Sequence, residues 1–220
     1  MLRAAAVVGA AYALGSVPVS YLVARHTRGI DIRRVGSGNV GASNVYQTVS
    51  RALVVPVGLT QVAQGAAGPL LARAVGLGAG GEAAAGIAAV VANDWNPWLR
   101  FSGGRGVGQA IGIMAATSPA ALATFIAVSL GGVALRMVPQ GVALGLLAAP
   151  FASAAAGDDR VTSLGLAAIA ATVMTKRLLG NGAPDPLAAG ERVWWIRLVY
   201  DRDIRDREAW VRRGLGGQDS

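Results

Sequence analysis

The sequence predicts an all-α integral membrane protein with about seven transmembrane helices. Hydrophobic residues make up 53% of the 220 residues and charged residues only 15%, whereas a soluble domain is usually about a quarter charged. A series of long apolar segments supports the same fold class. So does the uneven distribution of charge along the chain.

Seven apolar segments follow one another with short connections. The first is long enough to span a bilayer and carries no charge, the second is interrupted by Pro56 and Gly65, and the third contains Asp94. Uncharged runs of this length are typical of transmembrane helices, and the alternative is a soluble bundle of unusually apolar helices. The segments are residues 4–24, 52–71, 83–99, 107–117, 119–135, 138–156 and 161–175.

The cationic side chains predict the topology. If the N-terminus is outside and every segment crosses, all but three of the 20 cationic side chains fall on one side of the membrane. The exceptions are Arg3, Arg73 and Arg160. The excess of positive charge marks the cytoplasmic side. We therefore expect a multi-pass protein of the plasma membrane with a cytoplasmic C-terminus and a cytoplasmic active face.

Composition also restricts the chemistry. The chain has no cysteine and a single histidine, His26. Disulfides and thiolate metal sites are therefore excluded, and a histidine-rich metal site or a Ser/His/Asp triad has little support. We expect neither a metal nor a cofactor.

The C-terminal residues differ in character from the rest. We divide the chain into a membrane domain, residues 1–180, and a basic and aromatic cytoplasmic tail, residues 181–220. In the tail, Trp194 and Trp195 precede alternating Arg and acidic residues, with an i,i+4 pair at Asp201 and Arg205. This pattern predicts an amphipathic helix over residues 191–213 that lies on anionic membrane lipids, although a solvated charged helix is the alternative. Nucleic acid is not an expected partner, because acids nearly balance bases here.

A glycine-rich loop follows the first apolar segment. Gly36, Gly38 and Gly41 satisfy G-x-G-x-x-G, but no strand precedes them and Gln61 stands where a dinucleotide fold needs an acid. Glycines allow backbone N–H groups to face an anion. We therefore predict an anion-binding loop, with a plain turn as the alternative. Polar and cationic side chains at Arg33, Arg34, Ser37, Asn39, Ser43 and Asn44 would contribute.

A second loop, residues 93–108, places Arg105 among Gly103, Gly104 and Gly106. Arginine binds phosphate through two parallel hydrogen bonds, so this loop is a second candidate phosphate site.

Two further charged residues are candidates for the site. Asp94, near the end of the third segment, has either a catalytic role or a buried salt bridge. Arg136 is either a cytoplasmic anchor or a third phosphate ligand.

Three motifs, in this order and spacing, resemble the PlsY family of membrane glycerol-3-phosphate acyltransferases over residues 1–180. They are Gly15-Ser-Val-Pro18, Gly36-Ser-Gly-Asn-Val-Gly-Ala-Ser-Asn44 and Phe101-Ser-Gly-Gly-Arg-Gly-Val107. The resemblance implies transfer of an acyl group from acyl phosphate to the 1-hydroxyl of glycerol 3-phosphate. The product would be lysophosphatidic acid, an early intermediate of phospholipid synthesis. No acyl-CoA, metal or covalent acyl-enzyme is implied.

The resemblance also implies which residues bind the substrates. Arg105 stands where the family usually has lysine, and Arg136 matches a cation ahead of the later spans. The phosphate-binding residues carried over by position are Ser37, Gly38, Asn39, Gly41 and Asn44 in the first loop and Gly103, Gly104 and Arg105 in the second.

The chain departs from the family pattern at charged positions. The family's D-x-x-K-G block is Gln61-Val-Ala-Gln-Gly65, and its catalytic histidine and asparagine are Ala171 and Met174. Asp94 and the tail are the candidates to replace them. Three functions follow as hypotheses: a divergent acyltransferase, a catalytically impaired relative that binds phospholipid or partners a membrane enzyme, and a small anion transporter. The pattern defines no oligomeric state.

Overall fold

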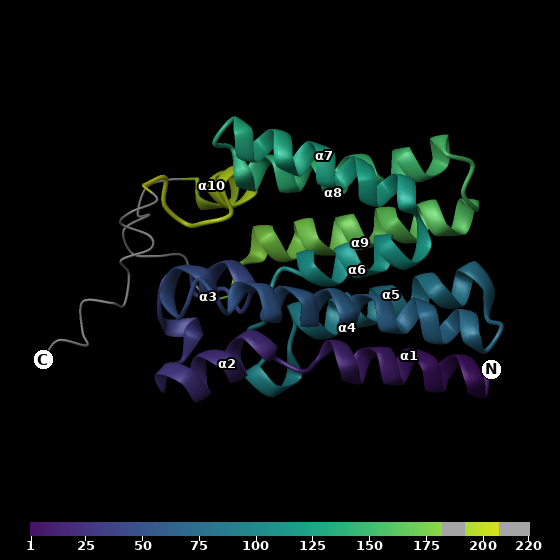
Figure 1. The fold of residues 1–220 in the computed structure, drawn as a ribbon, viewed down its shortest axis with the longest axis horizontal. Coiled ribbons are helices and arrows are strands. Elements are labelled where there is room, and N and C mark those ends of the chain that lie inside the picture. The colour runs from purple at the N-terminus through teal and green to yellow at the C-terminus, as the bar shows by residue number, and fades with distance from the viewer. Residues whose placement is uncertain (182–191, 207–220) are drawn as a thin grey trace, which may run out of the picture.

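The computed structural model describes residues 1–181 and 192–206, and within these ranges the chain forms helices and no strand (Figure 1). The all-helical prediction is therefore confirmed. The helices are α1 (Leu2–Gly15), α2 (Val19–Arg28), α3 (Ala42–Thr48), α4 (Val54–Ala74), α5 (Gly78–Asp94), α6 (Val107–Thr117), α7 (Pro119–Ala134), α8 (Val138–Ala155), α9 (Arg160–Leu179) and α10 (Val193–Tyr200). Two 3₁₀ turns, η1 (Ile32–Arg34) and η2 (Pro97–Leu99), complete the fold.

Each of the seven predicted segments forms helix, but they differ in length. Three helical segments of the described chain are long and apolar enough to cross a membrane by length and composition: residues 2–28, 138–155 and 160–179. By contrast, α6 has 11 residues and is about 16 Å long, roughly half of a bilayer core. The number of complete crossings and the orientation of the termini remain predictions.

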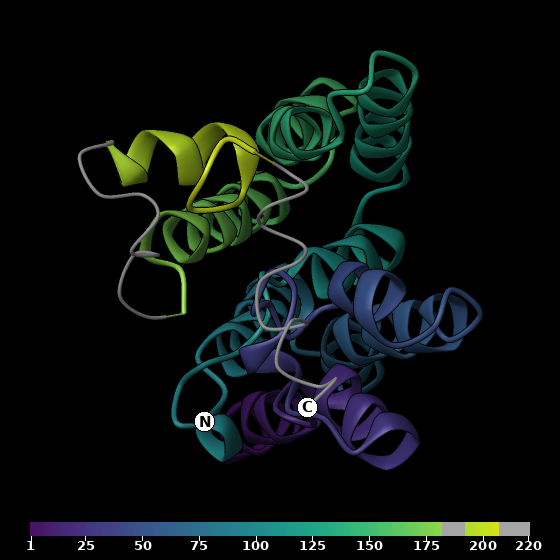
Figure 2. The same cartoon turned by 90° about the vertical axis from the view of Figure 1, so that its left-hand side faces the viewer.

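The helices run back and forth between two ends of the molecule (Figure 1). Both glycine loops, the α7–α8 turn and α10 lie at one end, whereas the N-terminus of α1 and the α4–α5 and α8–α9 turns lie at the other. Figure 2 shows α7 to α10 on one side and α1, α2 and α4 on the other. Helix α9 packs against α5 and α8, and α6 packs against α4, so these helices connect the two sides.

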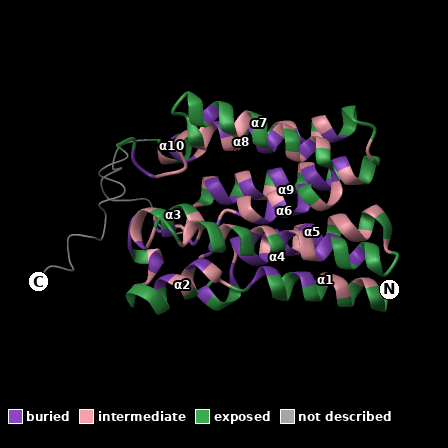
Figure 3. Cartoon of the chain, in the orientation of Figure 1, coloured by how far each residue is buried: buried purple, intermediate pink, exposed green. Residues whose placement is uncertain are grey.

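The outer surface of the bundle is apolar. Leu59 on α4, Leu130 on α7 and Phe151 on α8 are 65%, 61% and 76% exposed, and Figure 3 shows exposed residues along the outer faces of the helices. Large contiguous exposed apolar areas are rare in monomeric soluble proteins. This surface therefore favours the predicted membrane protein over the soluble bundle.

The tail differs from the prediction. Helix α10 ends at Tyr200 because Asp201 adopts the left-handed conformation, with φ of 56°. The helix therefore does not continue to Arg205, and the expected i,i+4 pair between Asp201 and Arg205 is wrong: the carboxylate of Asp201 pairs with Arg105. Residue 191 and residues 207–213 of the predicted helix lie outside the described residues.

Helix α6 lies so close to α4 that their backbones touch at glycines. A Cβ atom at Gly112 would overlap the carbonyl oxygen of Val62, and one at Gly65 would overlap the carbonyl oxygen of Gln109. Close backbone approach at small residues is how helices pack in membranes, where the hydrophobic effect does not drive association. This contact holds the short α6 in place.

We therefore predict that Gly112→Ala destabilises the protein. The added methyl group must push α6 away from α4, and overpacking of this kind costs about 1–3 kcal/mol. The control is Gly131→Ala in α7, where an added Cβ meets nothing within 4 Å. Thermal unfolding in detergent should show a lower midpoint for Gly112→Ala only. Equal midpoints for the two variants would contradict the close contact.

Candidate active site

The two glycine loops meet at a cavity of about 370 Å³. The charged lining residues gather at one end, where Arg105 and Arg177 lie beside the carboxylate of Asp201. The other polar side chains of the lining are those of Asn39, Ser43, Gln61, Asn93 and Gln109. The apolar side chains of the lining come from four helices and include Val62 of α4, Ile111 of α6, Val142 and Leu146 of α8 and Val173 of α9. The site therefore combines a charged end with an apolar channel.

The first glycine loop is shaped by the side chain of Asn44. Its Nδ2 donates to the carbonyl oxygens of Ile32, Val35 and Asn39, each at 3.1 Å, and its Oδ1 accepts from the backbone N–H of Ser37. Asn44 is fully buried. The sequence predicts that Asn44 binds phosphate directly, whereas in the structure its side chain is engaged in holding the loop in shape.

Of the other predicted residues of this loop, Asn39 and Gly41 line the cavity, whereas Ser37 and Gly38 do not. The Oδ1 atom of Asn39 is buried and has no hydrogen-bond partner among the described residues. Gly38 has φ of 67°, a conformation that favours glycine, and its carbonyl oxygen accepts from Asn181. Asn39 and Ser43 are thus the polar side chains of this loop that line the cavity, and Asn39 Oδ1 is free to accept a hydrogen bond.

The second loop packs tightly against the end of α5. The backbone N–H of Gly104 donates to the carbonyl oxygen of Asn93 at 3.0 Å. A Cβ at Gly103 would overlap that same oxygen, so the loop can reach this position only with glycine. Gly104 lines the cavity and Gly103 lies behind it.

Helix α6 begins at the cavity without a side-chain cap. Its N-terminal residue follows Gly106, which has φ of 62°, and Gly106, Val107 and Gly108 all line the cavity. The first N–H groups of a helix have no partner within the helix and carry a partial positive charge. Arg105 lines the same cavity as these first residues of α6.

Asn181 connects the two loops. Its Nδ2 donates to the carbonyl oxygen of Gly38 at 3.3 Å and to that of Gly103 at 2.9 Å. This single side chain after the end of α9 therefore fixes the distance between the two glycine loops. The sequence indicated no role for it.

Arg105 faces the tail. Its guanidinium forms an ion pair with Asp201 and donates to the carbonyl oxygen of Arg177 at 3.3 Å. The Arg177 guanidinium lies 3.8 Å from the same carboxylate. The carboxylate of Asp201 thus lies between two arginines of the cavity, in the way that a phosphate group would.

Two arginines attach α10 to α9. Arg177 donates to the carbonyl oxygens of Arg197 and Val199, each at 3.0 Å, and Arg197 donates to that of Leu179 at 2.6 Å. Arg197 also pairs with Asp203 at 2.5 Å. These contacts position the residue that follows α10, Asp201, over the cavity.

Neutral amides occupy the positions where the family pattern has charges. Gln61 donates to Ser20 Oγ at 3.3 Å, and Gln64 donates to the carbonyl oxygen of Leu14 at 2.8 Å. Gln109 donates to Gln64 Oε1 and, at 3.0 Å, to Asn93 Oδ1. The amides therefore join α4, α6 and α5 to the end of α1.

The amide chain ends at Asp94. Asn93 Nδ2 donates to Asp94 Oδ1 at 2.9 Å. Asp94 is fully buried, lies outside the cavity lining and forms no ion pair within the described residues. The expected salt bridge is absent from that part of the chain. A catalytic role for Asp94 remains a prediction. The hydrogen bond that it accepts from Asn93 orients the Asn93 side chain.

Three predicted cations lie elsewhere. Arg136 is exposed in the α7–α8 turn, with φ of 60°, and does not line the cavity. Arg33 and Arg34 line a different groove. Among the family's catalytic positions, Ala171 and Met174 also lie outside the cavity lining, where α9 contributes Val173 and Arg177.

The sequence pattern indicated no role in the site for Asn93, Gln109, Arg177 or Asp201. Arg177 follows Val173 by one helical turn, so both reach the same side of α9. That spacing was the available signal. For Asp201 the sequence offered only an acid within a charged tail.

The chain is similar to known proteins along most of its length. A family model described as glycerol-3-phosphate acyltransferase matches residues 5–181. Glycerol-3-phosphate acyltransferase 5 of Dehalococcoides mccartyi is 37% identical over 214 residues, covering 93% of this chain and 91% of the relative. The glycerol-3-phosphate acyltransferase of Desulforudis audaxviator is 40% identical over 152 residues, covering 69% of this chain and 76% of the relative.

A solved structure is similar as well. The crystal structure of PlsY, an integral membrane glycerol 3-phosphate acyltransferase in its glycerol 3-phosphate form, matches with a TM-score of 0.74 and 28% identity. The match covers 79% of this chain and 88% of that chain. With its family match, its relatives and its apolar helices, the chain is a membrane protein that belongs to the PlsY family of glycerol-3-phosphate acyltransferases.

Proposed function

We propose that the 370 Å³ cavity is the active site in which an acyl phosphate donates its acyl group to glycerol 3-phosphate. The chain acts as a glycerol-3-phosphate acyltransferase of phospholipid biosynthesis. The donor, the binding residues and the cytoplasmic face of the plasma membrane are our proposals. The observation that carries them is the meeting of two arginines, two glycine loops and an apolar channel in one cavity.

Both ends of the cavity suit this pair of substrates. Arg105, Arg177 and the first N–H groups of α6 supply positive charge and hydrogen-bond donors for phosphate groups. The channel of Val62, Ile111, Val142 and Leu146 can accept an acyl chain. The protein would therefore hold the acyl carbonyl close to the polar end, where the hydroxyl of the acceptor binds.

The chemistry needs positioning more than a protein base. The acceptor hydroxyl oxygen attacks the acyl carbonyl carbon, the bond from that carbon to the phosphate oxygen breaks, and inorganic phosphate leaves. The hydroxyl proton passes to a phosphate oxygen. Arg105 and Arg177 would stabilise the charge that develops on the leaving phosphate, and the protein would gain rate by orienting the two reactants.

Asp201 has to move in this scheme. Among the described residues that line the cavity it is the only acid, and its carboxylate pairs with Arg105. A phosphate cannot bind Arg105 in the same place. We therefore infer that substrate phosphate displaces Asp201, and that the carboxylate offsets one of the two arginine charges when the site is empty.

The first prediction is turnover by the purified protein. In detergent, with acyl phosphate and glycerol 3-phosphate, lysophosphatidic acid and inorganic phosphate should appear in equal amounts. The matched controls are a mock preparation and an active family member measured in parallel. No product above the mock preparation would exclude this reaction and leave a phosphate-binding relative or an anion transporter as the function.

The second prediction concerns Arg105. Loss of one charged contact to a transition-state phosphate lowers kcat by about 100- to 1000-fold, so Arg105→Ala should lose that much activity. It should also lose thermal stabilisation by glycerol 3-phosphate. Arg51→Ala, which removes an exposed cation outside the cavity lining, is the control. Unchanged activity and stabilisation in Arg105→Ala would make the second loop a simple turn.

The third prediction concerns Asp201. Because the neutral amide of Asp201→Asn no longer competes for Arg105, the KM for the phosphate substrates should fall about threefold or more, as expected for loss of a partly exposed ion pair, with kcat retained. Asp206→Asn, an exposed acid outside the cavity lining, is the control. A lower kcat at unchanged KM would instead identify Asp201 as a base. If no variant turns over, stabilisation by inorganic phosphate gives the same comparison.

A further inference from the structure

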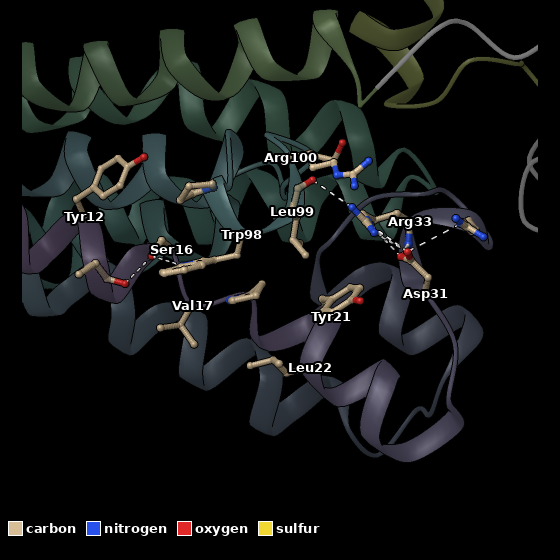
Figure 4. A pocket seen from close by; sticks show the side chains of 15 residues that line it. Tyr12, Ser16, Val17, Tyr21, Leu22, Asp31, Arg33, Trp98, Leu99 and Arg100 are labelled. Carbon is tan, nitrogen blue, oxygen red and sulfur yellow. Dashed lines mark hydrogen bonds and ion pairs between the residues drawn. The ribbon is translucent and has the colours of Figure 1, made fainter.

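A second hollow lies between the α1–α2 break and the turns η1 and η2 (Figure 4). This groove has a volume of about 920 Å³ and shares no lining residue with the candidate active site. We call it the α1–α2 groove. It exists because Pro18 ends the first helical segment: α1 stops at Gly15, α2 begins at Val19, and the chain between them is not helical.

One end of the groove is positively charged. Arg33, Arg34 and Arg100 line it together with a single acid, Asp31, and Figure 4 shows Arg33 and Arg100 at the same end. The hydrogen bond from Arg33 lowers the pKa of the Asp31 carboxyl, so Asp31 stays ionised and neutralises one arginine. Three cations and one anion leave a net charge of +2 at this end.

Two of these arginines are available to a ligand. Arg33 is held by Asp31 at 2.6 Å and by the carbonyl oxygen of Leu99 at 3.1 Å. Arg34 is 86% exposed and reaches Asp31 only at 4.0 Å. Arg100 is exposed and has no hydrogen-bond or ion-pair partner within residues 1–181 and 192–206. Arg34 and Arg100 can therefore form charge-assisted hydrogen bonds with an anion.

The other end of the groove is apolar and aromatic. Tyr12, Val17, Leu22 and Trp98 line it, and Trp98 is 72% exposed. These side chains lie on or beside the first apolar segment, where the surrounding solvent is the bilayer. Figure 4 shows Tyr12 and Trp98 away from the arginines. An amphipathic Trp at such a boundary is typical of a membrane interface.

The wall of the groove is held rigidly by polar contacts. The indole N–H of Trp98 donates to Ser16 Oγ at 3.0 Å, and Ser16 Oγ donates to the carbonyl oxygen of Ala13 at 2.8 Å. Asn96 Nδ2 donates to the carbonyl oxygen of Ser16 at 2.7 Å. The exposed indole ring is therefore fixed before any ligand binds, which reduces the entropy lost on binding.

We propose that the α1–α2 groove binds one anionic phospholipid of the surrounding bilayer, separate from the catalytic cavity. Its phosphate would lie against Arg34 and Arg100, and an acyl chain would lie along Leu22, Val17 and Trp98. Charge and shape together identify this occupant. A free anion would leave the apolar end uncovered, and a zwitterionic lipid would leave the two arginines without net compensation.

The test uses the full chain in detergent with added lipid. Phosphatidylglycerol should raise the thermal midpoint more than phosphatidylcholine of the same chains, and native mass spectrometry should retain one phosphatidylglycerol. Each arginine near anionic lipid contributes about 1 kcal/mol, so the double variant Arg34→Gln with Arg100→Gln should bind phosphatidylglycerol about 30-fold more weakly. Its binding of phosphatidylcholine should not change.

The matched control is Arg28→Gln, an exposed arginine at the end of α2 that does not line the groove. Equal weakening by the control would mean that general surface charge, not a site, attracts the lipid. Equal stabilisation by inorganic phosphate would assign the groove to a soluble anion. Unchanged phosphatidylglycerol binding in the double variant would overturn the proposal. Acyl transfer in neutral detergent should be retained by both variants.

Discussion

The site depends on close backbone contact between the second glycine loop and the end of α5. Gly103 and Gly104 press against the carbonyl oxygen of Asn93, with no space for a Cβ atom at Gly103. From this contact the chain must continue into α6, whose uncapped N-terminus then faces the cavity. Asn181 brings the first loop to the same place by bonding to both loops. The two glycine loops are therefore held at the cavity by backbone contacts and by the amide side chains of Asn44 and Asn181.

That arrangement explains how the chain accommodates the loss of charges from the family pattern. A buried ion is costly unless it is paired, and removing one partner of a pair leaves the other uncompensated. Here both charged positions of the D-x-x-K block are glutamine, and their amides form hydrogen bonds with Ser20, Leu14 and Gln109. Both positions are uncharged, so neither leaves an ion without its partner. The fold therefore retains its connection between α4 and the α1–α2 break without a buried ion.

The sequence predicted the helical segments and both glycine loops because these features depend on local patterns. Apolar runs predict helices in lipid, and glycine clusters predict close backbone approach. The sequence did not predict that Asn44 turns inward or that Arg33 and Arg34 face another groove, because the direction of a loop side chain depends on tertiary contacts. The length of α10 was overestimated for the same reason. Asp201 pairs with Arg105, which is nearly one hundred positions away in the sequence. The i,i+4 spacing of a helix cannot predict a contact between residues so far apart.

The arginines behind the net charge of +8 include two groups that have different surroundings. Arg105 and Arg177 line the cavity and are compensated by Asp201 and by backbone carbonyls. Arg34 and Arg100 line a groove that has a single acid, which is already occupied by Arg33. An arginine whose charge is paired within the protein must exchange that partner for the substrate when substrate binds. An arginine without a paired acid attracts an anion from outside the protein. The same residue type therefore suits reversible substrate binding in the cavity and retention of a lipid in the groove.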